Sequence, residues 1–205
     1  MPVLYHAYHT RSSSLVTLID ELGADVDIRD VSVRRGDGSG AVDPANPHPE
    51  GKVPYLVDGD EHLRERGAIM LYLTDRYPEA GLGPVHGAPG RGAYLSWLSY
   101  YQGVMEPLLL LRVAGLSHPV IGETLRDVDT MTARLAEALE RGPWLLGERF
   151  SAADLLCVSP FGWLPDLIPD HPAIHDWVRR CEERPAAQRT RARDAASAAR
   201  AAEMA

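Results

Sequence analysis

The chain has 205 residues, of which 45% are hydrophobic and 24% are charged, and 21 basic residues against 29 acidic ones give a net charge of −8. This balance is that of a folded globular protein, and the length allows one large domain or two small ones. The acidity, with basic residues spread along the chain, argues against a nucleic-acid partner, because such a protein concentrates its basic residues on one face.

Nothing in the sequence predicts a membrane span or a disulfide framework. The longest apolar runs, such as Leu108 to Leu111, are far shorter than the ~20 residues that a bilayer requires, and the N-terminus lacks the basic and apolar regions of a signal peptide. We therefore expect a cytoplasmic protein with no membrane contact. Cys157 and Cys181 are too few for a scaffold and too far apart for a C-x-x-C site, so we expect two reduced core thiols.

The first thirty residues predict a strand, a helix and a second strand. The β-branched and aromatic run from Val3 to Tyr8 predicts a buried strand, and polar residues 9–14 form its exit loop. Between Leu15 and Leu22 apolar residues recur at i, i+3, i+4 and i+7, and Gly23 follows as a stop signal, so a helix is expected there. A second strand is predicted around Val26 to Ile28.

The next segment predicts a loop, a hairpin and a helix. Residues 36–49 contain three glycines and three prolines, too many breakers for regular structure. Two strands, Val53 to Val57 and His62 to Leu63, flank the turn sequence Asp58-Gly59 and predict a hairpin. A helix is expected from Glu65 and ends before Pro78.

The glycine- and proline-rich residues 81–92 are the best candidate for a domain boundary. We expect residues 1–80 to form an α/β domain of β-α-β, β-β-α order, residues 81–92 a linker, and residues 93–205 an all-α bundle. The helices of the bundle are predicted from Ala93 to Ala114, Pro119 to Arg141, Ser151 to Phe161 and Pro172 to Glu183, followed by an Ala/Arg-rich tail that begins as a helix and frays at its end.

Five short motifs in this order give the chain a resemblance, over essentially its whole length, to the cytosolic glutathione S-transferases. The resemblance implies a thioredoxin-like N-terminal domain that binds glutathione as a co-substrate and a helical domain that binds a second substrate. The motifs are Thr10-Arg11-Ser12, Glu21-Leu22-Gly23, Gly51-Lys52-Val53-Pro54-Tyr55-Leu56, Glu65-x-x-Ala68-Ile69-x-x-Tyr72-Leu73 and Phe150-Ser151-Ala152-Ala153-Asp154.

Pro54 opens the first strand of the hairpin. A proline cannot donate to a sheet ladder, so on its own it indicates an edge strand or a strand start. The resemblance implies more: a cis Val53-Pro54 peptide, with the main chain of Val53 pairing with the cysteinyl backbone of glutathione as an added strand. Lys52 is either a solvated surface residue or a partner of the glycyl carboxylate.

The turn before the first helix is where a thiol would be activated. A helix N-terminus carries partial positive charge and unpaired N–H groups, which favour a thiolate. The resemblance places Thr10 at the position of the activating hydroxyl, with Ser12 as its neighbour, in a serine/threonine-type enzyme. We expect the hydroxyls of Ser13 and Ser14 to cap the helix.

Two positions depart from the family pattern. Tyr8 stands where a proline is common, which leaves Tyr5 or Tyr8 as alternative sources of the activating hydroxyl. Glu65 matches the acid that pairs with the α-amino group of the ligand, but Arg66 replaces the usual Ser or Thr beside the α-carboxylate. These two residues also fit a solvated charge run with Arg64, and we expect Arg66 to face solvent.

The bundle supplies residues for folding and for the second substrate. Ser151 and Asp154 form a capping-box pattern before an apolar helix, so we assign both to folding. Most aromatic residues at helical spacing belong to a core, but one or two of Tyr100, Tyr101 and Met105, together with Tyr8, are candidates to line an apolar electrophile site. The eight histidines show no metal-site spacing, so no metal is proposed.

These features predict a bacterial glutathione S-transferase that conjugates the glutathione thiolate to apolar electrophilic small molecules. The bacterial source is suggested by composition, since a single basic residue, Lys52, is lysine. Two alternatives remain: a glutathione-dependent isomerase, lyase or peroxidase, with disulfide exchange among them, on the same fold, or a non-catalytic module that binds a protein partner. The resemblance also implies a two-fold homodimer.

Overall fold

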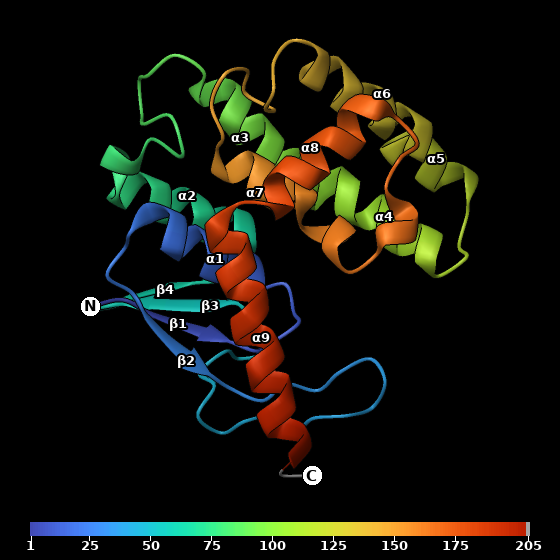
Figure 1. Ribbon diagram of the computed structural model, residues 1–205. Coiled ribbons are helices and arrows are strands. Elements are labelled where there is room, and N and C mark those ends of the chain that lie inside the picture. Colours follow the sequence, from blue (N-terminus) through green and yellow to red (C-terminus); the bar gives the residue numbers. More distant parts are fainter. Residues whose placement is uncertain (204–205) are drawn as a thin grey trace. The chain divides into compact units, whose positions relative to one another are not determined.

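The computed structural model describes residues 1–203, and its internal contacts form two compact units (Figure 1). The first unit contains Met1–Ala80 together with the described residues from Arg184 onward, and the second is Gly81–Glu183. The boundary after residue 80 coincides with the start of the glycine- and proline-rich segment.

A four-stranded sheet is the centre of the first unit. The strands lie in the order β2-β1-β3-β4, with β1 parallel to β2, and β3 antiparallel to both β1 and β4. This arrangement confirms the predicted thioredoxin-like fold. Leu4 and Leu56 face each other across the β1–β3 ladder and are fully buried. The strands are β1 Val3–His6, β2 Asp27–Asp30, β3 Tyr55–Asp58 and β4 Glu61–Leu63.

Three α-helices complete this unit. They are α1 Ser13–Leu22, α2 Arg66–Arg76 and α9 Pro185–Glu203, with a short 3-10 turn at Pro78–Ala80. α1 ends where the sequence predicted, because Gly23 adopts a left-handed φ of 59° and its N–H bonds to the carbonyl of Asp20.

The last helix differs from the expected division, which placed every residue after 92 in the helical bundle. α9 lies against α1, within the first unit (Figure 1). Arg184 donates two hydrogen bonds of 2.6 Å to the carboxylate of Glu21, and Arg189 donates two, of 2.7 and 3.0 Å, to Asp20. The arginines of the tail therefore find their partners on α1, 163 and 169 residues earlier in the sequence.

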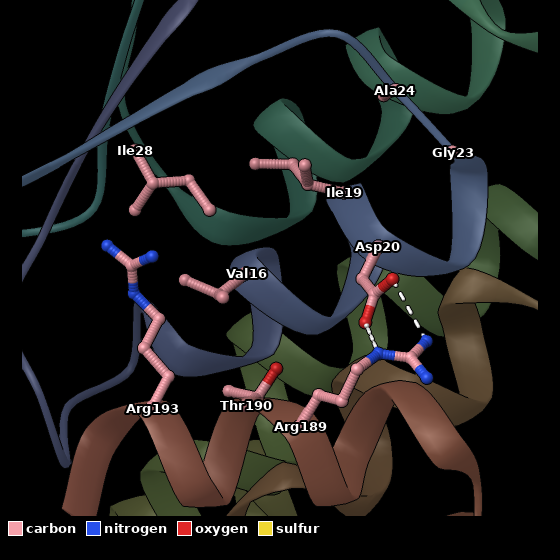
Figure 2. Close-up of a pocket in the computed structure, with 9 residues that line it drawn as sticks. All are labelled: Val16, Ile19, Asp20, Gly23, Ala24, Ile28, Arg189, Thr190 and Arg193. Atoms are coloured by element: carbon pink, nitrogen blue, oxygen red, sulfur yellow. Dashed lines mark hydrogen bonds and ion pairs between the residues drawn. The ribbon is translucent and has the colours of Figure 1, made fainter. Parts of the chain in front are cut away.

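A cleft of about 380 Å³ lies between α1, β2 and α9, and Figure 2 shows nine residues that line it. Val16, Ile19 and Ile28 give it an apolar wall. Its two arginines are engaged by carboxylates, Arg189 by Asp20 and Arg193 by Asp30. None of the site residues predicted from the sequence lines this cleft.

The second unit is helical. The segment from α3 to α4 covers the predicted first helix, and α7 and α8 confirm the last two. Tyr94, Tyr101 and Trp177 are fully buried in the chain. The elements are α3 Arg91–Tyr100, a π-helical segment Tyr101–Met105, α4 Glu106–Val113, α5 Pro119–Leu125, α6 Val128–Glu140, α7 Ala152–Val158, 3-10 turns at Ser159–Gly162 and Pro165–Leu167, and α8 Pro172–Glu182.

The helix predicted from Pro119 to Arg141 is two helices. Arg126 has a φ of 66°, which ends α5, and the carboxylate of Asp127 accepts a 2.7 Å hydrogen bond from the backbone N–H of Thr130. Asp is among the preferred N-cap residues because its side chain satisfies a free N–H of the first turn. The prediction of a single helix was wrong because apolar residues continue on one face from Ile121 to Leu139, across the break at Arg126.

The N-terminus of α7 confirms the capping box that the sequence predicted. The Asp154 carboxylate is fully buried and accepts hydrogen bonds from the backbone N–H groups of Leu145 and Ser151, from the Ser151 hydroxyl and from Nε1 of Trp177, at 2.8 to 3.0 Å. Burial raises the pKa of the Asp154 carboxyl, although these four donors oppose the shift. One side chain thus connects α7, α8 and the loop before α7.

Cys157 and Cys181, both among the described residues, are buried and are not joined in a disulfide. Within residues 1–203, no helix is long and apolar enough to cross a membrane. In the same described range, no group of three or more His, Cys, Asp or Glu side chains is placed to hold a metal ion.

Candidate functional site

The loop between β1 and α1 carries the hydroxyls that the sequence singled out. His9 takes a left-handed φ of 51° in this loop, a conformation that few residues other than glycine adopt. The turn brings Thr10 and Ser12 to the N-terminus of α1, where unpaired N–H groups favour an anion.

Thr10 and Ser12 differ in accessibility. Their hydroxyl oxygens lie 2.7 Å apart, and the Thr10 hydroxyl also lies 2.7 Å from the carbonyl oxygen of Ala7, to which it can donate. The backbone N–H of Ala7 donates to the Ser12 oxygen over 3.2 Å. Ser12 is fully buried, whereas Thr10 is half-buried. Of the two candidate residues, only Thr10 is partly exposed.

Behind Ser12 lies a polar pair that the sequence analysis missed. Nδ1 of His6, a fully buried residue of β1, lies 2.8 Å from the Ser12 oxygen, and Nε2 of His6 lies 3.0 Å from Oδ1 of Asp194 on α9. The sequence held weak signals for both: a histidine inside an apolar strand, and an acid among the arginines of the tail. The two residues are 188 positions apart, so no local pattern pairs them.

Asp194 contacts both His6 and the β1–α1 loop. Its Oδ2 accepts a 2.9 Å hydrogen bond from the backbone N–H of His9 and a 2.6 Å bond from the Ser13 hydroxyl. Burial favours the neutral acid, but the hydrogen bonds from His6, Ser13 and His9 outweigh it and leave the pKa of Asp194 below its ordinary value. Asp194 is therefore ionised at neutral pH.

The expected capping role of Ser13 and Ser14 was wrong. Neither hydroxyl bonds to a free N–H of α1: that of Ser13 donates to Asp194, and that of Ser14 donates to the carbonyl oxygen of Arg11 over 3.0 Å. The buried carboxylate is the stronger acceptor for Ser13, because hydrogen bonds to charged groups are shorter and stronger than those between neutral groups.

Arg35 contacts Tyr8, the residue that stands where the family commonly has a proline. The guanidinium of Arg35 lies 4.2 Å from the centroid of the Tyr8 ring and donates a 2.9 Å hydrogen bond to the Tyr8 carbonyl oxygen. The alternative hydroxyl of Tyr5 is engaged elsewhere, since it accepts a 3.3 Å hydrogen bond from Arg29. Arg35 thus replaces by side-chain contacts the restraint that a proline ring would give to this loop.

The Val53-Pro54 peptide is cis, as the resemblance implied. The loop before it is fixed by buried Asn46, whose side-chain amide donates a 3.0 Å hydrogen bond to the carbonyl oxygen of Lys52. The Lys52 ammonium is exposed and lies 3.0 Å from the carboxylate of exposed Glu50. The backbone here is thus well anchored, while the Lys52 side chain remains on the surface.

The start of α2 corrects the expectation for Arg66. The residue is 4% exposed, so its side chain lies inward and does not face solvent. Glu65 precedes it with a φ of 67°, a conformation that costs a non-glycine residue about 1–3 kcal/mol and that functional sites retain. The prediction failed because a run of charged residues gives no information on which side chain the tertiary structure covers.

The candidates for the second-substrate site fall into two groups. Tyr101 and Met105 are fully buried in the π-helical segment, where the N–H of Glu106 bonds to the Tyr101 carbonyl, five residues back. Pro107 follows and has no N–H to continue α-helical bonding, which favours this wider turn. Tyr100 is half-buried, burial raises its pKa, and the guanidinium of Arg134 lies 3.8 Å from its ring centroid.

Comparison with known proteins agrees with this geometry. Residues 4–81 match the model of the glutathione S-transferase N-terminal domain, and residues 116–185 match that of the C-terminal domain. The chain is 31% identical over 207 residues to the disulfide-bond oxidoreductase YfcG of Escherichia coli, which covers 89% of this chain and 91% of the relative. The chain belongs to the glutathione S-transferase family.

Solved structures share the whole family fold. The glutathione transferase of Methylococcus capsulatus has 27% sequence identity and a TM-score of 0.77, covering 95% of this chain and 99% of its own. A sphingomonad glutathione S-transferase complexed with glutathione has 27% identity and a TM-score of 0.75, covering 94% and 98%. The predicted family and fold are thereby confirmed, including the bundle that follows the thioredoxin-like unit.

Proposed function

We propose that this protein is a glutathione S-transferase whose Thr10 hydroxyl stabilises the thiolate of bound glutathione. The observation that supports this most is the placement of Thr10: the residue is partly exposed, lies at the N-terminus of α1, and has its hydroxyl held by the Ala7 carbonyl oxygen and by buried Ser12. A hydroxyl donor and a helix N-terminus both favour a thiolate over a thiol. The thiolate then forms a sulfur–carbon bond with an electron-poor carbon, and a leaving group departs or the product takes up a proton.

The other predicted residues are proposed to bind and orient glutathione. The main chain of Val53, beside Pro54, pairs with the cysteinyl backbone; Lys52 approaches the glycyl carboxylate; Glu65 and Arg66 hold the amino and carboxylate groups of the glutamyl end. We propose that Tyr8 and Tyr100 contribute to the apolar electrophile site and that the enzyme works in the cytoplasm. Tyr101 and Met105 are proposed to support that site from the core.

Two assays test this proposal. The protein should be retained on immobilised glutathione and released by free glutathione, and it should accelerate conjugation of an activated aryl halide. Retention without turnover of the aryl halide, a peroxide or a mixed disulfide would favour a non-catalytic module. Absence of both retention and turnover would refute the assignment.

Disulfide exchange is the second candidate, because a relative 31% identical to this chain is named a disulfide-bond oxidoreductase. In that reaction the glutathione thiolate attacks a disulfide sulfur, and the departing thiolate takes a proton. A chain that reduces a mixed disulfide of glutathione at least tenfold faster than it conjugates aryl halides would support this alternative.

We also propose that the chain forms a homodimer, since members of the family pair about a two-fold axis. Light scattering at micromolar concentration should then give a mass of about twice the 22.5 kDa of one chain. A mass equal to that of the single chain would contradict this proposal.

Arg66 gives a prediction because it is buried and basic. Arg66→Ala should weaken glutathione binding tenfold or more, since a charge-assisted pair with the ligand carboxylate contributes ~1.5–3 kcal/mol, and high salt should reduce the difference. Titration calorimetry at low and high salt measures the effect, with exposed Arg64→Ala as the matched control. Arg66→Ser, which restores the usual family residue, should recover part of the loss. An affinity unchanged in Arg66→Ala, in a variant that unfolds at the wild-type urea concentration, would refute this role.

A further inference from the structure

Four side chains form a continuous polar chain from α9 to the surface of the β1–α1 loop. Asp194 lies 3.0 Å from Nε2 of His6, Nδ1 of His6 lies 2.8 Å from the Ser12 oxygen, and that oxygen lies 2.7 Å from the Thr10 oxygen. The inner three residues are 3% exposed or less. Thr10 alone is accessible, so the chain joins a buried imidazole and carboxylate to the point where we place the thiol.

The proton positions in this chain follow from the acceptor at its inner end. The Asp194 carboxylate can only accept, so a neutral His6 carries its proton on Nε2 and presents the lone pair of Nδ1 to Ser12. The Ser12 hydroxyl then donates to His6. The Thr10 hydroxyl donates to the carbonyl oxygen of Ala7 over 2.7 Å, and in the relay it turns to donate to the Ser12 oxygen, which lies at the same distance. In this arrangement the Thr10 oxygen has a lone pair for a thiol proton.

We propose that the Asp194–His6 pair takes up the thiol proton of bound glutathione through the hydroxyls of Ser12 and Thr10. The S–H bond breaks as the proton passes to the Thr10 oxygen, the Thr10 proton passes to Ser12, and the Ser12 proton passes to Nδ1 of His6. The products are a thiolate and an imidazolium, with no net change in charge. This step rests on the proposed function, because it requires the thiol to lie at Thr10.

The same transfer reverses the two hydrogen bonds that join His6 to Ser12 and Ser12 to Thr10, while Nε2 of His6 still donates to Asp194. After it, Nδ1 of His6 donates to Ser12, Ser12 donates to Thr10, and the Thr10 hydroxyl donates to the thiolate. The hydroxyl that accepted the proton thus becomes the donor that stabilises the anion.

Two aspartates lie beside His6, one on α9 and one on β2. Asp194 on α9 is ionised and in direct contact, and its other oxygen is held by His9 and Ser13 of the loop. On β2 the residue paired with His6 is Asp30, whose carboxylate contacts Arg193 of α9 at 3.2 Å. A buried imidazolium beside a carboxylate is a charge pair with satisfied hydrogen bonds, which is the condition for burying a charge.

Nuclear magnetic resonance of nitrogen-15-labelled histidine tests the relay in the wild-type protein. The His6 ring signals, assigned by their loss in His6→Gln, should change from neutral to imidazolium when glutathione binds at neutral pH. S-methylglutathione, which has no thiol proton, should bind without this change. A His6 that stays neutral while the ultraviolet absorbance shows bound thiolate would overturn the relay.

Variants give a second readout. His6→Gln, Asp194→Asn and Ser12→Ala should each raise the apparent pKa of the bound thiol by about one unit or more, measured from thiolate absorbance against pH. His175→Gln, an exposed histidine of α8, is the matched control and should leave it unchanged. If none of the three variants moves the thiol pKa, the relay is refuted. If wild-type protein does not bind glutathione, the proposed function fails and the relay fails with it.

Discussion

Replacement of Asp154 by alanine should destabilise the helical unit by about 3–5 kcal/mol, because it removes the shared acceptor of a buried network. The carboxylate holds the N–H groups of Leu145 and Ser151, the Ser151 hydroxyl and the Trp177 indole. Each donor left buried without an acceptor costs about 1–3 kcal/mol, and the variant also leaves a cavity where the side chain packed.

Tryptophan fluorescence during urea unfolding measures this loss in the helical unit alone. All four tryptophans of the chain, Trp97, Trp144, Trp163 and Trp177, lie within Gly81–Glu183. Asp127→Ala is the matched control, because that exposed aspartate caps α6 with one backbone hydrogen bond. A loss in Asp154→Ala no larger than that in Asp127→Ala would show that the buried network does not stabilise the unit.

The predictable parts of the fold are those encoded by local pattern. The apolar spacing from Leu15 to Leu22, followed by Gly23, placed α1 to within two residues, and Asp58-Gly59 placed the hairpin. The packing of α9 against α1, within the first unit, was not predictable from local pattern. It depends on ion pairs such as Arg184–Glu21, whose members are 163 residues apart.

The candidate site also has one part that the sequence predicts and another that depends on tertiary structure. The resemblance predicts Thr10 and Ser12 as the candidate hydroxyls. The structure places both at the N-terminus of α1, where the local pattern of a strand, hydroxyl residues and a helix predicts them. Which hydroxyl is accessible depends on burial behind the loop, where His6 meets Asp194 from the far end of the sequence. Arg66 is the opposite case, since its charged neighbours suggested exposure and the tertiary structure buries it.

Replacement of Thr10 by alanine should reduce turnover by about 10²–10³-fold, the loss that follows removal of one donor from a developing anion. Glutathione binding should fall by a smaller factor than turnover, because the contacts proposed for Lys52, Val53 and Arg66 with glutathione remain in the variant. Thr10→Ser keeps the hydroxyl and should retain most of the activity. Steady-state kinetics with an activated aryl halide, combined with calorimetric binding of glutathione, measure both quantities.

The dependence of turnover on pH separates Thr10 from Ser12. In Ser12→Ala the path to His6 is broken, so the thiolate forms only at higher pH, where the Thr10 hydroxyl still stabilises it. The acidic limb of its profile should therefore move upward and activity should recover as pH rises. In Thr10→Ala the donor is absent at every pH, so the loss should persist across the range. Recovery of Thr10→Ala at high pH, or a loss in Ser12→Ala that pH does not relieve, would reverse these two roles and place the activating hydroxyl on Ser12.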